Sequence, residues 1–271
     1  MTSKYTLQNA SNFFLNLHTR RDFNKMLIPS SENLALLGNI CSLDTSESKK
    51  IYKDFLDYCT LKYKNVYIVP GPWELSFRVP EHYDKSMYNL YKLATQYNNI
   101  NILNNSNTNI PNTDITLVGS TLWVRVPYFK HQCMFEYNYI WLNRSYDGLG
   151  QILGNDILSW HLEDMNYIRD YTKGGANRYI ILTHHLPNHI LVKDLGRKRM
   201  ESSYLERYMK KPIEVWLGGA GDHSVSGCFG VCNDVFCATN PYTTFNSAKK
   251  ISESYNPEAF VSLRTSNIEL V

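Results

Sequence analysis

The chain has 271 residues, of which 43% are apolar, enough for the core of one large domain, so we predict a single domain over residues 1–271. Its formal net charge is only +3, which argues against nucleic acid or an anionic membrane surface as a partner. No run of 18 apolar residues occurs and no apolar signal core follows Met1, so we expect a soluble, cytoplasmic protein.

The first half of the chain alternates short apolar runs with amphipathic stretches. Two amphipathic stretches are predicted as helices, at residues 46–64 and 81–97, and in the first of them Ile51, Phe55 and Cys59 share one face. Strand–helix alternation of this kind is typical of an α/β domain. Four apolar runs are predicted as strands, at residues 33–40, 65–71, 100–106 and 114–124.

The second half of the chain ends in a cluster of strands. Residues 125–155 are rich in aromatic side chains and are predicted to be irregular. A third helix is predicted at 155–172, followed by a strand at 178–185 and a basic, partly helical segment at 193–211. Together these elements predict an α/β fold with a layered sandwich. Five further strands are predicted, at 213–219, 225–231, 234–240, 260–264 and 267–271.

The cysteines are predicted to be reduced thiols, because the sequence carries no secretion signal. The spacing of the last three, with three and then four intervening residues, leaves a zinc site open as an alternative. The run GCFGVCNDVFCATN favours two strands joined by an Asn-Asp turn, and we prefer that interpretation. The six cysteines are Cys41, Cys59, Cys133, Cys228, Cys232 and Cys237.

Polar segments stand at the ends of the apolar runs. Ligands of open α/β sheets gather at the carboxyl ends of the strands, so we expect these segments to converge at one edge of the fold. They are Asn16-Leu17-His18, Gly38-Asn39-Ile40, Gly71-Pro72-Trp73-Glu74, Thr183-His184-His185, and the run from Trp216 to His223.

The order and spacing of these segments resemble the calcineurin-like metallophosphoesterases, over roughly residues 10–245. That family has Asp-x-His, Gly-Asp, Gly-Asn-His-Asp/Glu, a strand-end His and Gly-His-x-His in the same order. Residues 114–124 also resemble the family's strand before its tryptophan, and residues 236–242 resemble its last strand, which leads to Asn-Pro. The resemblance implies the family's fold, a layered β-sandwich flanked by helices.

In that family the motifs hold two divalent metals close together, and one carboxylate bridges both. The metals lower the pKa of a bound water and hold the phosphate for in-line attack. The His of Gly-Asn-His is the usual candidate for protonating the leaving group.

Most of the family's positions are changed in the first three motifs of this sequence. The resemblance places Asn16 at the first Asp and Asn39 at the bridging Asp, where an amide carries no charge to offset two cations. Pro72 stands at the metal-binding Asn and Trp73 at the general-acid His, so no catalytic residue is assigned. His18 keeps the companion histidine of the first motif.

The later motifs also lose ligands. His184 matches the strand-end histidine, whereas Ala220 and Asp222 stand at the last two histidines. The second metal position would keep only Asn39 and His184, a vestigial site. The resemblance thus implies either no cofactor or one weakly bound divalent metal, with Mn, Zn, Mg and Fe not distinguished. That weak single-metal site would have four donors: Asn16, His18, Asn39 and Asp222.

Neighbouring side chains have candidate roles of their own. His185 and His223 are candidates for contact with a substrate, with a structural role as the alternative. Trp73 is predicted to be a packed aromatic that fills the former site. Glu74 is predicted to cap or pair locally without taking part in catalysis.

Three functions follow from these observations. The first is a catalytically impaired metallophosphoesterase-like protein, a pseudoenzyme, that serves as a scaffold or binding module for a protein partner or a further copy of itself. The alternative is a metal-dependent phosphoester hydrolase with a rearranged single-metal site. The third is nucleic-acid binding through the basic residues 196–211, which otherwise form a solvated loop. Metal content separates the first two, and salt-dependent binding tests the third.

Overall fold

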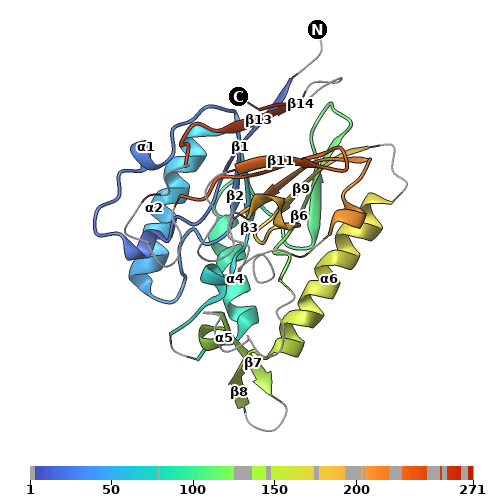
Figure 1. The fold of residues 1–271 in the computed structure, drawn as a ribbon. Coiled ribbons are helices and arrows are strands. Elements are labelled where there is room, and N and C mark those ends of the chain that lie inside the picture. Colours follow the sequence, from blue (N-terminus) through green and yellow to red (C-terminus); the bar gives the residue numbers. More distant parts are fainter. Residues whose placement is uncertain are drawn as a thin grey trace.

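The structure is a computed structural model that contains two six-stranded sheets and one two-stranded sheet. Figure 1 shows the strands of the two large sheets lying between helix α2 on one side and helix α6 on the other. The structure describes residues 4–78, 80–124, 136–144, 148–173, 177–192, 203, 205–219, 228–242, 251, 255–263 and 268–270.

The first sheet has the strand order β14-β13-β1-β2-β3-β4. Strands β1 to β4 are parallel, whereas β13 pairs antiparallel with β1 and β14 pairs antiparallel with β13. The bounds are Tyr5–Ala10 for β1, Asn33–Leu37 for β2, Asn65–Val69 for β3, Ile100–Ile102 for β4, Phe260–Leu263 for β13 and Ile268–Leu270 for β14.

The second sheet has the strand order β11-β12-β10-β9-β6-β5. Its four inner strands are parallel, and the two edge strands β5 and β11 are antiparallel to their neighbours. The bounds are Ser106–Asn109 for β5, Ile115–Ser120 for β6, Arg178–Thr183 for β9, Ile213–Gly218 for β10, Cys228–Cys232 for β11 and Val235–Thr239 for β12. The small sheet pairs β7 (Trp141–Arg144) with β8 (Gly148–Gln151).

Three long helices cover the sheets, namely α2 (Ser46–Lys62), α4 (Tyr83–Ala94) and α6 (Gly154–Thr172). Helix α2 begins at a capped turn, because the Thr45 side chain accepts a hydrogen bond from the Ser48 N–H. The shorter helices are α1 (Phe23–Met26), α3 (Pro72–Leu75) and α5 (Glu136–Tyr139), and the 3₁₀ turns are η1 (Leu15–Leu17), η3 (His189–Leu191) and η4 (Glu206–Tyr208).

The core is divided into layers, because successive side chains of each strand point to opposite faces of its sheet. One apolar cluster joins the two sheets and includes Leu37 of β2 and Leu182 of β9. The opposite face of the first sheet packs on α2 through Phe55, and the opposite face of the second packs on α6 through Ile168. Two sheets with helices on both outer faces confirm the predicted α/β class.

The three predicted helices are α2, α4 and α6, but the predictions for residues 100–106 and 125–155 are wrong. The predicted strand 100–106 is divided between β4 and β5, which belong to different sheets. The chain turns between them at Asn105, whose φ is +46°. Residues 125–155 were expected to be irregular, yet they contain the hairpin of β7 and β8.

Strand β1 lies outside the predicted elements. Its polar residues Gln8 and Asn9 interrupt the apolar pattern, although both side chains are buried. The Gln8 amide donates to the carbonyls of Ile28 and Pro257, at 2.9 and 2.6 Å, which satisfies it inside the protein.

The cysteine-rich run forms the predicted pair of strands. β11 and β12 are antiparallel and turn at Asn233 and Asp234, whose φ angles of +49° and +67° suit a tight hairpin. Cys41, Cys59, Cys232 and Cys237 are free thiols. Within the described ranges, no helix is both long and apolar enough to cross a membrane.

A buried carboxylate on α6 supports a pH prediction. Asp164 accepts hydrogen bonds from Asn105 Nδ2 (2.7 Å) and the Trp123 N–H (3.2 Å), and burial raises its pKa from 3.8 to about 6. The raised pKa means that the stability from protonated Asp164 is complete below about pH 4 and is lost as the pH rises through about 6.

We therefore expect the difference in unfolding free energy between wild type and Asp164→Asn to fall by up to roughly 3 kcal/mol from about pH 4 to about pH 7. Urea unfolding at a series of pH values measures this difference. The exposed Asp54→Asn is the matched control, and its difference from wild type should stay constant. A flat profile for Asp164→Asn would contradict the raised pKa.

Candidate functional site

The turns that follow β2, β3, β9 and β10 meet at one edge of the two sheets. Gly38 and Asn39 both adopt left-handed backbone, with φ of +79° and +56°. A Cβ on Gly38 would lie 2.4 Å from His184 Nδ1 and 2.8 Å from the Gly71 Cα, so the approach requires glycine. A Cβ on Gly219 would lie 3.0 Å from the same His184 atom. Segments 38–40, 71–74 and 183–185 and residue 219 therefore converge as predicted, whereas residues 220–223 lie outside the described residues.

A single buried carboxylate holds two of these turns together. Glu74 is fully buried, and its carboxylate accepts hydrogen bonds from the N–H groups of Gly71 (2.9 Å), Asn39 (2.9 Å) and Ile40 (2.5 Å). Burial raises its pKa to about 7, while these backbone hydrogen bonds act in the opposite direction. Glu74 caps its own turn, as predicted, and also joins it to the turn after β2. This second role is the main one that sequence reasoning missed.

The two asparagines predicted as metal ligands are engaged by Trp73. Asn39 Oδ1 accepts the Trp73 backbone N–H at 2.9 Å. Asn16 Oδ1 accepts the Trp73 indole N–H at 2.8 Å and the Ser42 N–H at 3.2 Å. An amide oxygen has two lone pairs, so Asn16 Oδ1 has both engaged within the protein.

The segment from Asn16 to His18 is not the end of a strand, which corrects the sequence interpretation. β1 ends at Ala10, and Asn16 lies in the 3₁₀ turn η1. The His18 Nε2 lies 2.8 Å from the Phe13 carbonyl, and its ring packs edge-to-face on Tyr242. Partial burial is the main reason that its pKa is lowered. Asn16 and His18 thus contact different neighbours, although both were predicted to face one metal.

The two histidines after β9 are neutral side chains of the interior. His184 Nδ1 donates to the Leu37 carbonyl at 2.7 Å, and burial lowers the His184 pKa to about 4. His185 is 3% exposed, and neither of its ring nitrogens has a hydrogen-bond partner among the described residues. Burial, followed by the neighbouring His184 and His161, lowers the His185 pKa well below its usual value. His185 was a candidate for substrate contact, and it lies beneath the surface.

Trp73 lies beside a small cavity at this edge of the fold. Its side chain is 7% exposed and packs edge-to-face on Phe14, with ring centroids 5.4 Å apart. The cavity has a volume of about 190 Å³, and Asp44 and Arg78 form a 3.8 Å ion pair among its lining residues. The lining residues are Asn16, Ser42, Asp44, Trp73, Ser76, Phe77, Arg78 and Tyr139.

The described part of this site does not fit a pair of divalent metals. In the portion of the chain that the structure describes, no three His, Cys, Asp or Glu side chains form a group suited to a metal ion. The carboxylate of Glu74, which lies between two of the converging turns, faces three N–H donors. The predicted ligands Ala220 and Asp222 and the predicted substrate contact His223 lie outside the described residues.

Comparison with known proteins bears on the fold. No protein-family model matches this chain, and no curated protein matches it. A protein of known crystal structure is similar over 99% of both chains, with a TM-score of 0.56 and 13% sequence identity. At this level of identity the similarity concerns the fold alone, and it extends over nearly the whole of this chain.

Proposed function

We propose that this chain is a calcineurin-like metallophosphoesterase fold that has lost two-metal hydrolysis and acts as a scaffold or binding module for a protein partner. The order of the polar segments supports the family. The arrangement of two facing sheets between helices is compatible with the family's layered sandwich. No catalytic residue is assigned.

The observation that carries this proposal is the use of the site's polar groups in internal hydrogen bonds. Glu74 accepts three backbone N–H groups, and the side-chain oxygens of Asn39 and Asn16 accept the two N–H groups of Trp73. In a two-metal site such oxygens face cations and a phosphate. Here they hold the turns in place, so the segments that would carry out hydrolysis have a structural role.

The alternative, a single-metal hydrolase, requires Asn16, His18 and Asn39 to face one ion together with Asp222. Asn16 faces the Trp73 indole and His18 faces the Phe13 carbonyl. These contacts give the alternative no support, because a weakly bound metal ion at the single-metal site would first have to displace them.

We expect no hydrolysis of p-nitrophenyl phosphate or bis(p-nitrophenyl) phosphate that depends on this site, with Mn²⁺, Mg²⁺ or Zn²⁺ supplied. Loss of a general acid alone costs about 10²–10⁴-fold, and loss of the second metal removes part of the phosphate clamp as well. The assay is combined with elemental analysis of the purified protein, which should carry no stoichiometric metal.

The matched variants for this assay are His18→Ala and Asp222→Ala, with His189→Ala as a control because His189 is a half-buried histidine of η3 that belongs to neither predicted metal position. All three should leave the background rate unchanged. Turnover that disappears in the first two variants but not in the control would overturn the proposal in favour of the single-metal enzyme. Two tightly bound ions per chain would refute both.

A further inference from the structure

A larger cavity lies on the outer face of the second sheet, away from the converging turns. It has a volume of about 570 Å³ and is bounded by α6 and by residues 205–213, which lead into β10. Its apolar floor includes Ile168, Leu205, Ile213 and Trp216. Pockets that hold small organic ligands have volumes of about 300–1,000 Å³, so this cavity is of ligand size.

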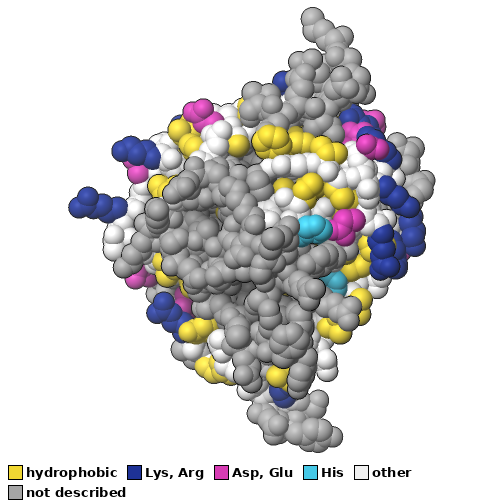
Figure 2. All heavy atoms as spheres, viewed as in Figure 1, with side chains coloured by type: hydrophobic (Ala, Val, Ile, Leu, Met, Phe, Trp, Pro, Cys, Tyr) yellow, Lys and Arg dark blue, Asp and Glu magenta, His cyan; other side chains and the backbone are white. Residues whose placement is uncertain are grey.

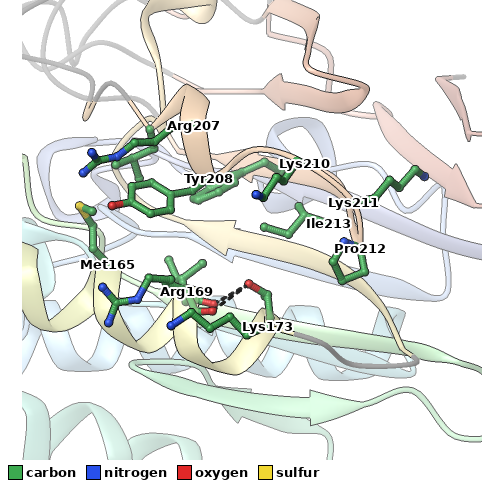
Figure 3. Close-up of a pocket in the computed structure, with 13 residues that line it drawn as sticks. Met165, Arg169, Lys173, Arg207, Tyr208, Lys210, Lys211, Pro212 and Ile213 are labelled. Atoms are coloured by element: carbon green, nitrogen blue, oxygen red, sulfur yellow. Dashed lines mark hydrogen bonds between the residues drawn. The ribbon is translucent and has the colours of Figure 1, made fainter.

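Positive side chains lie on two facing walls of this cavity. Figure 3 shows Arg169 and Lys173 on α6 opposite Arg207 and Lys210 of the segment before β10. Lys211 lies at the far end and pairs with Glu214 at 3.0 Å. Figure 2 shows Lys and Arg side chains gathered on the side of the molecule where α6 lies in Figure 1.

The positive charges on the two walls are unequally compensated. Asp170 pairs with Arg169 at 2.8 Å and with Lys173 at 2.9 Å, so the α6 wall has a local counter-charge. Across the cavity, Arg207 lies over the Tyr208 ring, 4.6 Å from its centroid. Neither Arg207 nor Lys210 has an acidic partner among the residues that the structure describes. This wall therefore presents positive charge that an incoming anion would neutralise.

The polar groups of the floor are already paired within the protein. The Trp216 indole N–H donates to Thr183 Oγ1 at 3.0 Å, and the Thr172 hydroxyl donates to the Ile168 carbonyl at 2.8 Å. The floor thus offers apolar contact, and the rim offers positive charge. The complementary ligand has an apolar or aromatic body that enters the cavity and one anionic group that stays at the rim.

We propose that this cavity is a binding site for a small organic anion, an apolar body that carries one phosphate, sulfonate or carboxylate group. Arg207 and Lys210 bind the anionic group, and Ile213 and Trp216 contact the apolar body. The site is independent of the proposed function, because it lies at the amino end of β10 and the converging turns follow its carboxyl end.

The probe for this site is 8-anilinonaphthalene-1-sulfonate, which joins an aromatic body to one sulfonate. Titration of the full chain at fixed ionic strength, followed by fluorescence, should show one saturable site. The double variant Arg207→Gln/Lys210→Gln should weaken binding roughly tenfold, as expected when charge-assisted contacts are lost. The matched double variant Lys49→Gln/Lys50→Gln removes two exposed charges from α2 and should change binding less than about twofold.

A third variant separates the contribution of the cavity's shape to probe binding from that of its positive charge. Met165 lies on the α6 wall, so Met165→Trp should fill the cavity and abolish probe binding while every positive side chain remains. Unfolding midpoints in urea are compared first, so that only folded variants are scored. Equal probe binding by wild type and the Arg207/Lys210 double variant, or by wild type and Met165→Trp, would overturn the proposal.

Competition against the fluorescent probe then identifies the chemical class of the natural ligand. Displacement of the probe by adenosine 5′-monophosphate points to a nucleoside phosphate, and displacement by decyl phosphate points to an alkyl phosphate. Either result supports the proposal. Displacement by neither compound, or only by hexaglutamate, would overturn it, and the hexaglutamate result would assign the cavity to an acidic protein segment.

Discussion

The Glu74→Leu variant is expected to lose at least roughly 3 kcal/mol of unfolding free energy, because each buried N–H left without an acceptor costs about 1–3 kcal/mol. Leucine fills a similar volume but accepts no hydrogen bond. The N–H groups of Gly71, Asn39 and Ile40 would all be left unpaired. Urea unfolding at pH 7 measures the loss.

Two further variants make this result specific. Glu74→Gln keeps one acceptor oxygen, so its loss should fall between those of wild type and Glu74→Leu. Glu32→Leu is the matched control, because Glu32 is 74% exposed and pairs only loosely with Lys64 at 3.8 Å. That change should stay within about 0.5 kcal/mol. Equal losses at positions 74 and 32 would show that the carboxylate does not hold the turns together.

The second large effect is expected at Trp73. The Trp73→Ala variant should lose roughly 3–5 kcal/mol, the range for truncation of a large buried aromatic side chain. Trp73→Phe keeps a ring against Phe14 but removes the indole N–H that Asn16 accepts, so its loss should be nearer 1 kcal/mol. Urea unfolding of both variants measures these losses, with Tyr88→Ala, at a 61% exposed position, as the control.

The same variants test the proposed function from another direction. Removal of the Trp73 ring opens space but restores no metal-ligating side chain. The Trp73→Ala variant should therefore still fail to hydrolyse p-nitrophenyl phosphate. A gain of metal-dependent turnover in Trp73→Ala would show that the indole blocks a complete site, and the loss of ligands would then not be the reason for inactivity. An unfolding free energy equal to that of wild type would show that Trp73 is not a packed part of the site.

Helices and inner strands could be predicted because their patterns are local. The helix at 46–64 has a regular apolar face, and the strand at 178–185 is a continuous apolar run before two histidines. Strand β1 could not be found in this way, since the buried Gln8 side chain is satisfied only by distant partners such as the carbonyl of Pro257.

The candidate site was predictable in its location but not in its contacts. Glycines after apolar runs mark where chains approach closely, and Gly38 and Gly71 do so here. The partner of Glu74 across the site is a backbone N–H 35 residues earlier in the chain, which no local pattern encodes. The first motif was misplaced because Asn16 and His18 look like the end of a strand, although β1 ends six residues before Asn16.

The pairing of β1 with β13 affects how this chain is made. Tyr5 and Leu263 are register partners, so the edge of β1 stays open during synthesis until residues near 263 have left the ribosome. An open edge is a template for pairing with other chains, and closure over so long a sequence distance is slow. The first sheet therefore reaches its native edges only after this region has been translated, and until then the unpaired edge of β1 is open to pairing with other chains.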